Sequence, residues 1–251
     1  MSSIPKVIHY CWFGGKPLPK LARKCIRSWK KYLPDYEIQE WNESNFDVNI
    51  IPYTAQAYEA KKYAFVSDYA RFWILYKYGG LYFDTDVEVI RNMDRIIEAG
   101  SFMGCETTCE EAKEKGIYLS VNPGSGIGAP AGSELYKEIL DLYDTMQFCK
   151  SDGSLNQTTI VEYTTDLLKG KGLRFTPEIQ DLGCVKIYPV DFFCPIHGDA
   201  RRLQITDNTV SIHHWAASWV SGWPKYREKI KKILGSKLTE SIINLRRSLR
   251  K

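Results

Sequence analysis

The sequence predicts one α/β domain with a largely parallel sheet, on three observations. Apolar strand-like segments alternate along the chain with segments of helical periodicity, which is the pattern of βαβ units. No Pro/Ser-rich linker divides the 251 residues, and 44% hydrophobic with 25% charged residues is typical of a soluble globular protein. No apolar run reaches the roughly 18 residues that a membrane span needs.

Each element follows from its local pattern. The first half is predicted to contain a buried strand over 6–13, an amphipathic helix over 19–32, a strand over 36–41, a long helix over 54–78 and a strand over 81–90. Gly79 and Gly80 are the C-terminal stop of the long helix. The second half is predicted to contain strands over 100–106, 117–122, 125–129, 185–190 and 209–214, helices over 134–148 and 158–168, and a polar loop or short helix over 109–115.

The C-terminal tail differs in charge from the rest of the chain. From Lys225 onward it holds ten Lys/Arg and two Glu, a net charge of +8, so the remainder carries −4. Its apolar residues recur at spacings of three and four: Tyr226, Ile230, Ile233, Leu234, Leu238, Ile242, Leu245 and Leu249. Such an amphipathic helix can lie on an anionic membrane surface or pack on the preceding domain, and the pattern does not choose between these. We therefore divide the chain into a domain over 1–223 and a tail over 224–251.

Cysteine usage favours a reduced, cytoplasmic protein. There are seven cysteines and no CxxC, so neither a disulfide framework nor a structural zinc site is expected. The N-terminus lacks the long apolar segment of a signal peptide. We expect a cytoplasmic location, with peripheral contact at the inner face of the membrane through the basic tail, and no nucleic-acid partner.

Two acids near the middle of the chain point to a metal site. Asp84 and Asp86 stand one residue apart on a predicted strand, so their side chains should point the same way. Carboxylates suit Mg²⁺ or Mn²⁺ when a diphosphate supplies further oxygens. A solvated strand end is the simplest alternative, and a phosphatase with the first Asp as nucleophile is another. The haloacid-dehalogenase pattern, however, has Thr or Val where this chain has Glu88.

Asp68 and Arg71 share a face of the preceding helix. A pair of this kind can be a plain surface salt bridge. Their face continues through Ala64 and Leu75, however, and a charged pair on an apolar face is costly to bury without a ligand. We therefore interpret the pair as part of a polar ligand site.

Trp12 and the His213-His214 pair extend this interpretation. Trp12 ends the first strand beside a Gly-Gly turn, where open α/β sheets bind ligands, although core packing is the usual role of such a residue. His213 and His214 end a late strand. Because neighbouring side chains on a strand face opposite sides, only one of them can enter the site.

Residues 124–129 fit the letters of a GxGxxA dinucleotide fingerprint. Pro130 would interrupt the helix that this fingerprint opens, and the expected acid, Asp144, falls within a helix rather than at a strand end. A tight loop lining a cleft is favoured instead.

Taken together, these segments resemble glycosyltransferase family 32, the DXD-containing sugar transferases. The matching segments, in the expected order, are IPKVIHYCWFGG, YEIQEWNESNFD, AFVSDYARFWILYKYGGLYFDTDVEV, IYPVDFFCP and IHHWAASW. The resemblance covers nearly the whole chain and extends more distantly to the glucosylating domain of large bacterial toxins. It implies a GT-A-type nucleotide-sugar-binding fold and a retaining, metal-dependent hexosyltransferase that uses Mn²⁺ or Mg²⁺. The implied donor is a nucleotide-diphosphate sugar, with UDP-sugars favoured. The implied acceptor is a glycan or lipid-linked oligosaccharide in the synthesis of a bacterial surface polysaccharide such as capsule.

By motif position, the resemblance also implies roles for single residues. The implied metal ligands are Asp84, Asp86 and His213. The implied catalytic residues are Asp68, Arg71, Asp84 and Asp86. The implied donor-binding residues are Trp12, Ser67, Asp68, Arg71, Tyr82, Ser218 and Trp219. The segment NPGSGIGA departs from the pattern of many members, which leaves an acceptor-side role of Asn122 open.

Two rival functions belong to other classes. A non-catalytic sugar- or nucleotide-binding module is the main alternative, and the complete DXD acids argue against it. A glycoside hydrolase would need two carboxylates across a scissile bond rather than side by side on one strand.

Overall fold

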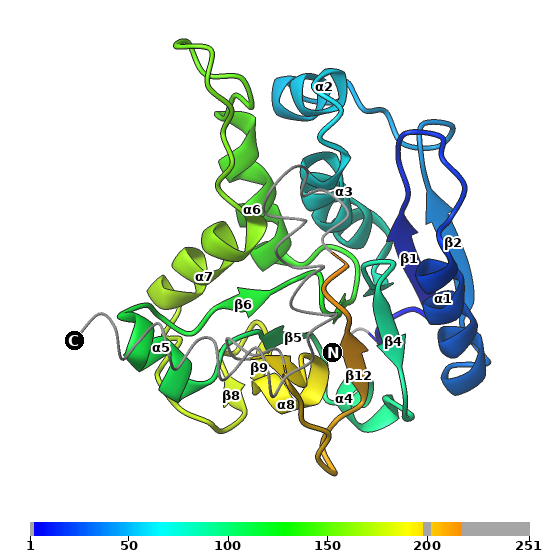
Figure 1. The fold of residues 1–251 in the computed structure, drawn as a ribbon, viewed down its shortest axis with the longest axis vertical. Helices are drawn as coiled ribbons and strands as arrows, with labels where there is room; N and C mark the ends of the chain where they lie inside the picture. Colours follow the sequence, from blue (N-terminus) through cyan, green and yellow to red (C-terminus); the bar gives the residue numbers. More distant parts are fainter. Residues whose placement is uncertain (1–2, 198–201, 217–251) are drawn as a thin grey trace, which may run out of the picture.

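The structure, a computed structural model, describes residues 3–197 and 202–216. An eight-stranded mixed sheet forms its centre, in the order β2-β1-β3-β7-β5-β9-β8 with β6 beside β5 (Figure 1). Its strands are β1 (Val7–Cys11), β2 (Glu37–Trp41), β3 (Gly80–Tyr82), β5 (Phe102–Cys105), β6 (Val121–Asn122), β7 (Ile127–Ala129), β8 (Gln180–Asp181) and β9 (Lys186–Tyr188). Five of these strands, β1, β2, β3, β5 and β9, run in one direction. The predicted α/β class with a largely parallel sheet is therefore confirmed.

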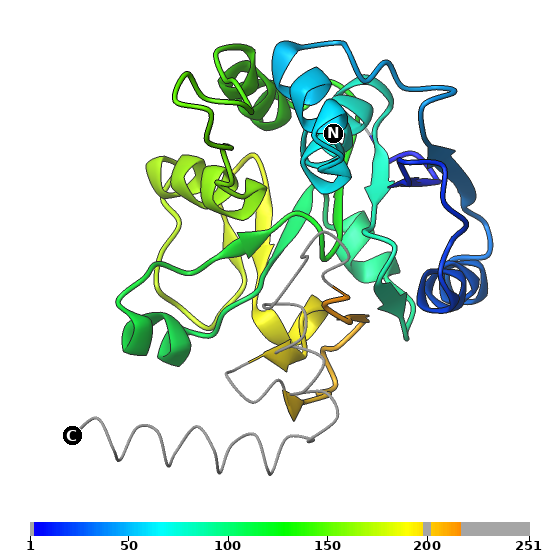
Figure 2. The same cartoon turned by 45° about the horizontal axis from the view of Figure 1, so that its top comes forward.

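Two short ribbons lie outside this sheet in the described chain. One pairs β4 (Val87–Val89) with β12 (Ser211–His213), and the other pairs β10 (Ile196–His197) with β11 (Arg202–Leu203). Figures 1 and 2 show β12, in orange, beside β4. The late strand predicted over 209–214 therefore exists, but it pairs with β4 rather than joining the main sheet.

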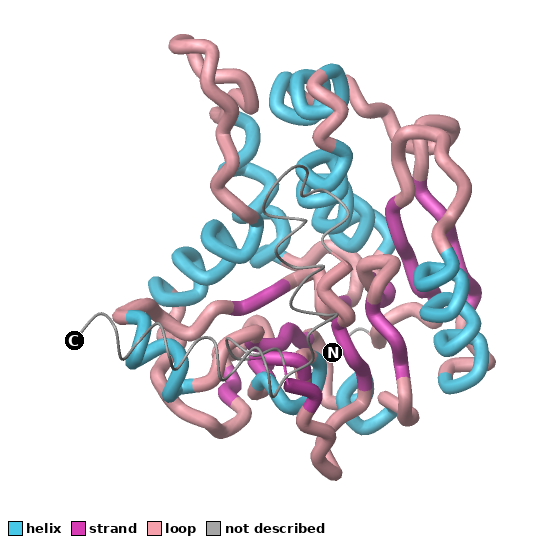
Figure 3. Tube along the Cα trace, in the orientation of Figure 1, coloured by secondary structure: helices cyan, strands magenta, loops and turns pink. Residues whose placement is uncertain are grey.

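Helices cover both faces of the sheet. They are α1 (Lys20–Tyr32), α2 (Pro52–Glu59), α3 (Tyr63–Tyr78), α4 (Asp94–Glu98), α5 (Cys109–Lys115), α6 (Glu134–Asp144), α7 (Ile160–Gly170) and α8 (Val190–Phe193). One buried cluster joins α2, α3, α5, α6 and α7 to the sheet, and a second joins α1, α4 and α8 to it. Figure 3 also shows the loop between α6 and α7 projecting from the body.

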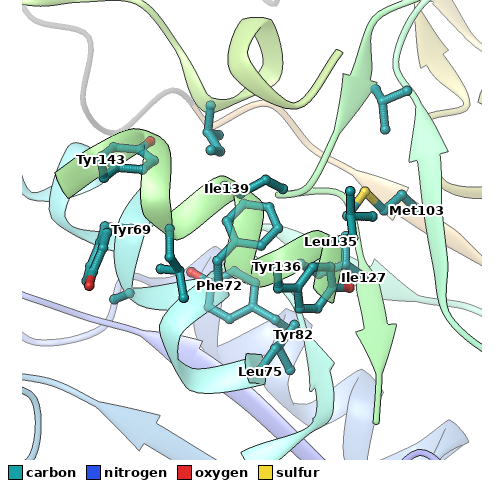
Figure 4. Packing of buried hydrophobic residues seen from close by; sticks show 14 of the residues in the cluster. Tyr69, Phe72, Leu75, Tyr82, Met103, Ile127, Leu135, Tyr136, Ile139 and Tyr143 are labelled. Atoms are coloured by element: carbon teal, nitrogen blue, oxygen red, sulfur yellow. The ribbon is translucent and has the colours of Figure 1, made fainter. Parts of the chain in front are cut away.

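Strand alternation decides which face each side chain meets. Leu81 and Phe83 belong to the cluster on the α1 side, whereas Tyr82 between them belongs to the cluster on the α3 side. Figure 4 shows Tyr82 among the side chains that α3 and α6 bury, such as Phe72 and Tyr136. Asp84 follows just after the end of β3 and contacts Arg71 of α3.

The predicted long helix over 54–78 is wrong, because the chain breaks between α2 and α3. Lys61 has a φ of 58°, and the backbone N–H groups of Lys61 and Lys62 donate to Tyr58 and Ala57. This bonding pattern ends a helix with one left-handed residue, a position that Gly usually fills. With Lys there instead, the sequence carries no visible stop.

The predicted stop at Gly79 and Gly80 is confirmed. Gly79 donates its N–H to the Leu75 carbonyl at the end of α3, and both glycines have positive φ values, 67° and 104°. A Cβ on Gly80 would lie 2.6 Å from the Val7 carbonyl oxygen. Only glycine allows this turn into β3, which aims the following residues at the site.

Candidate active site

Asp84 and Asp86 lie in a turn, not on a strand. The predicted strand over 81–90 is two strands, β3 and β4, separated by a turn in which Val87 donates its N–H to the Asp84 carbonyl (3.0 Å). The two carboxylates still converge, but the tight turn brings them together rather than strand alternation. The expected side-by-side acids are therefore present, for a different reason.

Arg71 lies between two carboxylates on the α3 side of this turn. Its Nη2 is 2.7 Å from Asp68 Oδ1 and 3.4 Å from Asp84 Oδ1. Asp68 and Arg71 are 9% and 3% exposed, so the inward face predicted for the pair is confirmed. Burial raises the pKa of Asp68 to about 7, with Arg71 opposing the rise and Asp84 adding to it. Burial also raises the pKa of Asp84. One guanidinium therefore does not balance the acids around it.

Tyr82 and Ser67 complete this part of the site. The Tyr82 hydroxyl donates to Asp84 Oδ1 (3.2 Å), and the Arg71 guanidinium lies over the Tyr82 ring, 5.0 Å from its centroid. Arg71 Nε donates to the Ser67 carbonyl (3.2 Å), so that residue positions the guanidinium through its backbone. Two of the predicted residues, Arg71 of α3 and Tyr82 of β3, thus contact Asp84, and Ser67 and Asp68 contact Arg71.

His213 reaches the turn because β12 pairs antiparallel with β4, which places it opposite Val87. Its Nε2 is 3.2 Å from Asp86 Oδ1. Burial would lower the pKa of His213, but Asp86 raises it well above its ordinary value. Burial would in turn raise the pKa of Asp86, but His213 and the Ala216 N–H lower it to about 2.

His214 points to another acid. Its Nε2 lies 2.7 Å from Glu88 Oε2, which also accepts from Lys24 Nζ at 2.7 Å. Strand alternation therefore assigns the two histidines as predicted, with His213 toward the DXD acids and His214 away from them.

The Asp84, Asp86 and His213 side chains could hold a metal ion. One ligand atom from each lies within 4.8 Å of the others, the one such group in the described residues. Two carboxylates and an imidazole are ordinary ligands for a divalent cation. Arg71 contacts two carboxylates, those of Asp68 and Asp84, so a further cation beside Asp84 would balance negative charge that one guanidinium leaves. The residues present therefore fit a divalent metal.

Gly124 is a contributor that the sequence did not reveal. Its carbonyl accepts the Asp84 N–H (3.1 Å), and any Cβ at this position would overlap Asp84 Oδ2 and crowd Arg71 Nη1. Asn122 supports the loop by accepting the Gly124 N–H (2.7 Å) while donating to Glu106 (2.8 Å). The Pro-Gly sequence signals a turn, but nothing in it names Asp84 as the neighbour.

The loop at 124–129 is not a dinucleotide fingerprint. The chain turns after Asn122 and then forms β7, a strand, where the fingerprint requires the start of a helix. The favoured interpretation, a tight loop beside a ligand site, agrees with the contact between Gly124 and Asp84.

Trp12 is the remaining expected donor-site residue that the structure describes. Trp12 follows β1, is half-buried, and packs against the hydrophobic cluster on the α1 side of the sheet. Its stacking role stays a prediction. Ser218 and Trp219 lie outside the described residues.

Comparison with known proteins identifies the segment that carries these acids. Residues 19–103 match the family described as "Glycosyltransferase sugar-binding region containing DXD motif". This stretch includes Asp68, Arg71 and both DXD acids. Residues 19–103 are a glycosyltransferase sugar-binding region of the DXD type. The predicted resemblance to glycosyltransferase family 32 is thereby confirmed over this segment, whereas the GT-A type of the fold stays a prediction.

Three glycosyltransferases are similar to this chain, over different lengths and with different sequence identities. The chain is 32% identical over 100 residues to inositol phosphoceramide mannosyltransferase 3 of Schizosaccharomyces pombe, covering 38% of this chain and 28% of that protein. It is 29% identical over 172 residues to the uncharacterized glycosyltransferase L373 of Acanthamoeba polyphaga mimivirus, covering 64% and 66%. The solved structure of the PaToxG glycosyltransferase is similar with a TM-score of 0.48 and 20% identity, covering 67% and 70%.

The matched parts are shorter than the relatives themselves. The chain spans less than two thirds of the length of these curated relatives. It therefore carries a glycosyltransferase region. Among the described residues, no helix is both long and apolar enough to cross a membrane.

Proposed function

We propose that this protein is a metal-dependent glycosyltransferase that moves a hexose from a nucleotide-diphosphate donor to a glycan acceptor, with retention of configuration. The observation that carries the proposal is the meeting of Asp84, Asp86 and His213 next to the buried Asp68–Arg71 pair. A binding module needs neither part of this arrangement, whereas a transferase needs both a diphosphate clamp and a grip on the sugar.

Asp84, Asp86 and His213 would hold the divalent cation. When bound, the cation neutralises charge on the departing diphosphate. Manganese suits this set better than magnesium, because magnesium prefers oxygen ligands alone and one of these ligands is an imidazole. We therefore propose Mn²⁺ as the better cofactor, with Mg²⁺ as a weaker substitute.

Asp68 and Arg71 would hold the donor sugar. Arg71 offers N–H donors beside the acids, and Asp68 can accept from sugar hydroxyls and stabilise the positive charge that develops on the ring in an oxocarbenium-like transition state. Ser67 and Tyr82 would line this pocket, and Trp12 would stack on the base. Ser218 and Trp219 would close over the diphosphate. We propose no protein nucleophile, because front-face attack by the acceptor hydroxyl also retains configuration.

The donor we favour is a UDP-sugar. The names of the Schizosaccharomyces pombe relatives support a mannosyl donor as the alternative. The proposed acceptor is a glycan or lipid-linked oligosaccharide in the synthesis of a bacterial surface polysaccharide such as capsule. A cytoplasmic location follows from a donor of this kind and stays a prediction.

A screen of nucleotide sugars tests the proposal. Full-length protein is incubated with UDP- and GDP-sugars, with Mn²⁺, Mg²⁺ or EDTA, and both hydrolysis and thermal stabilisation are measured. We expect one donor to be hydrolysed only with metal. Stabilisation by a sugar nucleotide without any turnover, even with acceptor glycans present, would favour the non-catalytic binding module instead.

The tail over 224–251 lies outside the described residues, and we propose that it makes peripheral contact with anionic membranes. Its +8 charge beside an apolar stripe supports this. Cosedimentation with anionic and neutral vesicles at low and high salt tests it, with a chain ending at Gly235 as the comparison. Salt-sensitive binding to anionic vesicles that truncation abolishes is the expected result, and no binding by the full chain contradicts it.

A further inference from the structure

The segment that follows β12 wraps around Asp86. His214 donates its backbone N–H to the Asp86 carbonyl (3.0 Å), and Ala216 donates its N–H to Asp86 Oδ2 (2.6 Å). We call residues 214–216 the strap. The strap occupies one carboxylate oxygen and leaves Oδ1 facing His213 Nε2, 3.2 Å away.

Trp215, in the middle of the strap, has an unusual backbone conformation. Its φ is 52°, in the left-handed region that a bulky side chain seldom adopts. Such a conformation persists only where the surroundings over-determine it, and it clusters at functional sites. The two hydrogen bonds to Asp86 on either side of Trp215 are one such constraint.

The Trp215 side chain supplies the other constraint. Its indole stacks on the His213 ring, with centroids 4.4 Å apart and 23° between the planes. At the same time Nε1 donates to the Ile196 carbonyl in β10 (2.8 Å). The indole is thus anchored at one end and covers a face of the imidazole at the other. Rotation of the His213 ring away from Asp86 would break this stack.

We propose that Trp215 is a positioning residue for the metal site, holding His213 Nε2 toward Asp86 Oδ1 while the strap makes Asp86 a ligand through one oxygen. This inference rests on the proposed function, because it requires a cation at Asp84, Asp86 and His213. Second-shell groups that orient a metal-binding histidine are worth about 10- to 100-fold in metal affinity.

The test is a Mn²⁺ titration of the full-length protein without donor, following free Mn²⁺ by electron paramagnetic resonance. Trp215→Ala removes both stack and anchor, and we expect its Kd for Mn²⁺ to rise about tenfold. Trp215→Phe keeps a stacking ring without the Nε1 donor, and its Kd should rise less. Trp73→Phe, a half-buried indole of α3, is the control and should bind as wild type.

A glycine variant distinguishes the effect of losing the Trp215 ring from the effect of its unusual backbone conformation. Trp215→Gly suits a φ of 52°, so it should melt above Trp215→Ala yet bind Mn²⁺ as weakly. A folded Trp215→Ala or Trp215→Gly protein with the wild-type Kd would overturn the positioning role and leave the proposed function standing. Wild-type protein that binds no Mn²⁺, with or without UDP, would overturn both.

Discussion

The two halves of the site are held in different ways. Asp68 and Arg71 are buried on α3, which packs in the main hydrophobic cluster, and Asp84 lies in the turn after β3 beside them. Asp86 lies in the turn just before β4 and His213 lies on β12, outside the main sheet, where the strap contacts both of them. We call these the core half and the ribbon half. We therefore expect substitutions in the core half to lower both the activity and the free energy of unfolding. Substitutions in the ribbon half should weaken metal binding with little effect on stability.

The largest expected effect is a loss of turnover, and we expect it for substitution of the DXD acid in either half. Asp84→Asn and Asp86→Asn each remove an anionic ligand at nearly constant volume, and we expect kcat/KM to fall about 1,000-fold, as when a group that stabilises transition-state charge is lost. Metal-buffered assays of donor hydrolysis check this. Near-normal turnover in either variant would refute the metal assignment.

Arg71→Ala should show most clearly that the two halves contribute differently to the free energy of unfolding. It leaves the buried Asp68 and the part-exposed Asp84 without their cation, and breaking a buried pair such as Asp68–Arg71 costs about 3 kcal/mol or more of unfolding free energy. Urea denaturation measures the loss. His213→Ala is the ribbon-half comparison and should lose much less. Equal losses from the two substitutions would contradict the division.

Gly124→Ala tests whether the close contact between Gly124 and Asp84 shapes the core half. The added methyl overlaps Asp84 Oδ2 and must displace either the loop or the carboxylate, so we expect about 2 kcal/mol of destabilisation and a lower kcat. Gly170→Ala is the control, since a Cβ there meets nothing within 4 Å. If both variants behave alike in unfolding and turnover, Gly124 does not shape the site.

His9, a buried residue of β1, predicts how the stability of the folded protein responds to acid. Burial lowers its pKa to about 4, with the Gly79 hydrogen bond opposing the shift, and Trp41 Nε1 donates to its Nδ1. Because the folded pKa lies below the ordinary 6.5, the unfolded chain takes up the proton first as the pH falls. The stabilisation is complete above pH 6.5 and is lost toward pH 4.

Comparison with His9→Gln isolates this contribution from other titrating groups. Between pH 7 and pH 5 the wild-type protein should lose about 2 kcal/mol more unfolding free energy than His9→Gln does. Urea unfolding at both pH values measures the difference. Parallel pH profiles for the two proteins would show that His9 does not titrate in this way.

The smallest effect should distinguish the two histidines of the ribbon half. His213→Ala should raise the Mn²⁺ concentration for half-maximal activity about tenfold, whereas His214→Ala, facing Glu88 and Lys24, should be milder. Activity measured against Mn²⁺ concentration checks the ranking. The reverse ranking would mean that β12 presents the other face to the DXD turn.

The core half is the part that the sequence predicts well. Local periodicity places β1, α1 and β2 within about two residues, and the i,i+3 spacing places Asp68 and Arg71 on one inward face. Local patterns fail at Lys61, where a helix ends without the glycine that usually occupies the left-handed position. They also fail at Asp84 and Asp86, where a turn interrupts the predicted strand.

The ribbon half depends on contacts that no local pattern encodes. The pairing of His213 with Val87 joins residues more than 120 positions apart, and alternation predicts only that one of the two adjacent histidines faces inward. Gly124 and the strap show the same limit, because a glycine in a turn and a tryptophan after a strand have many ordinary uses. Their roles become visible only through Asp84 and Asp86.

The central claim is that both halves meet at one metal ion. Anomalous X-ray diffraction from crystals of the full-length protein grown with Mn²⁺ and UDP tests it most directly. The account predicts one peak within bonding distance of Asp84, Asp86 Oδ1 and His213 Nε2, next to the Arg71 side chain. A peak bound elsewhere, or no peak at saturating Mn²⁺ with these side chains well ordered, would contradict it.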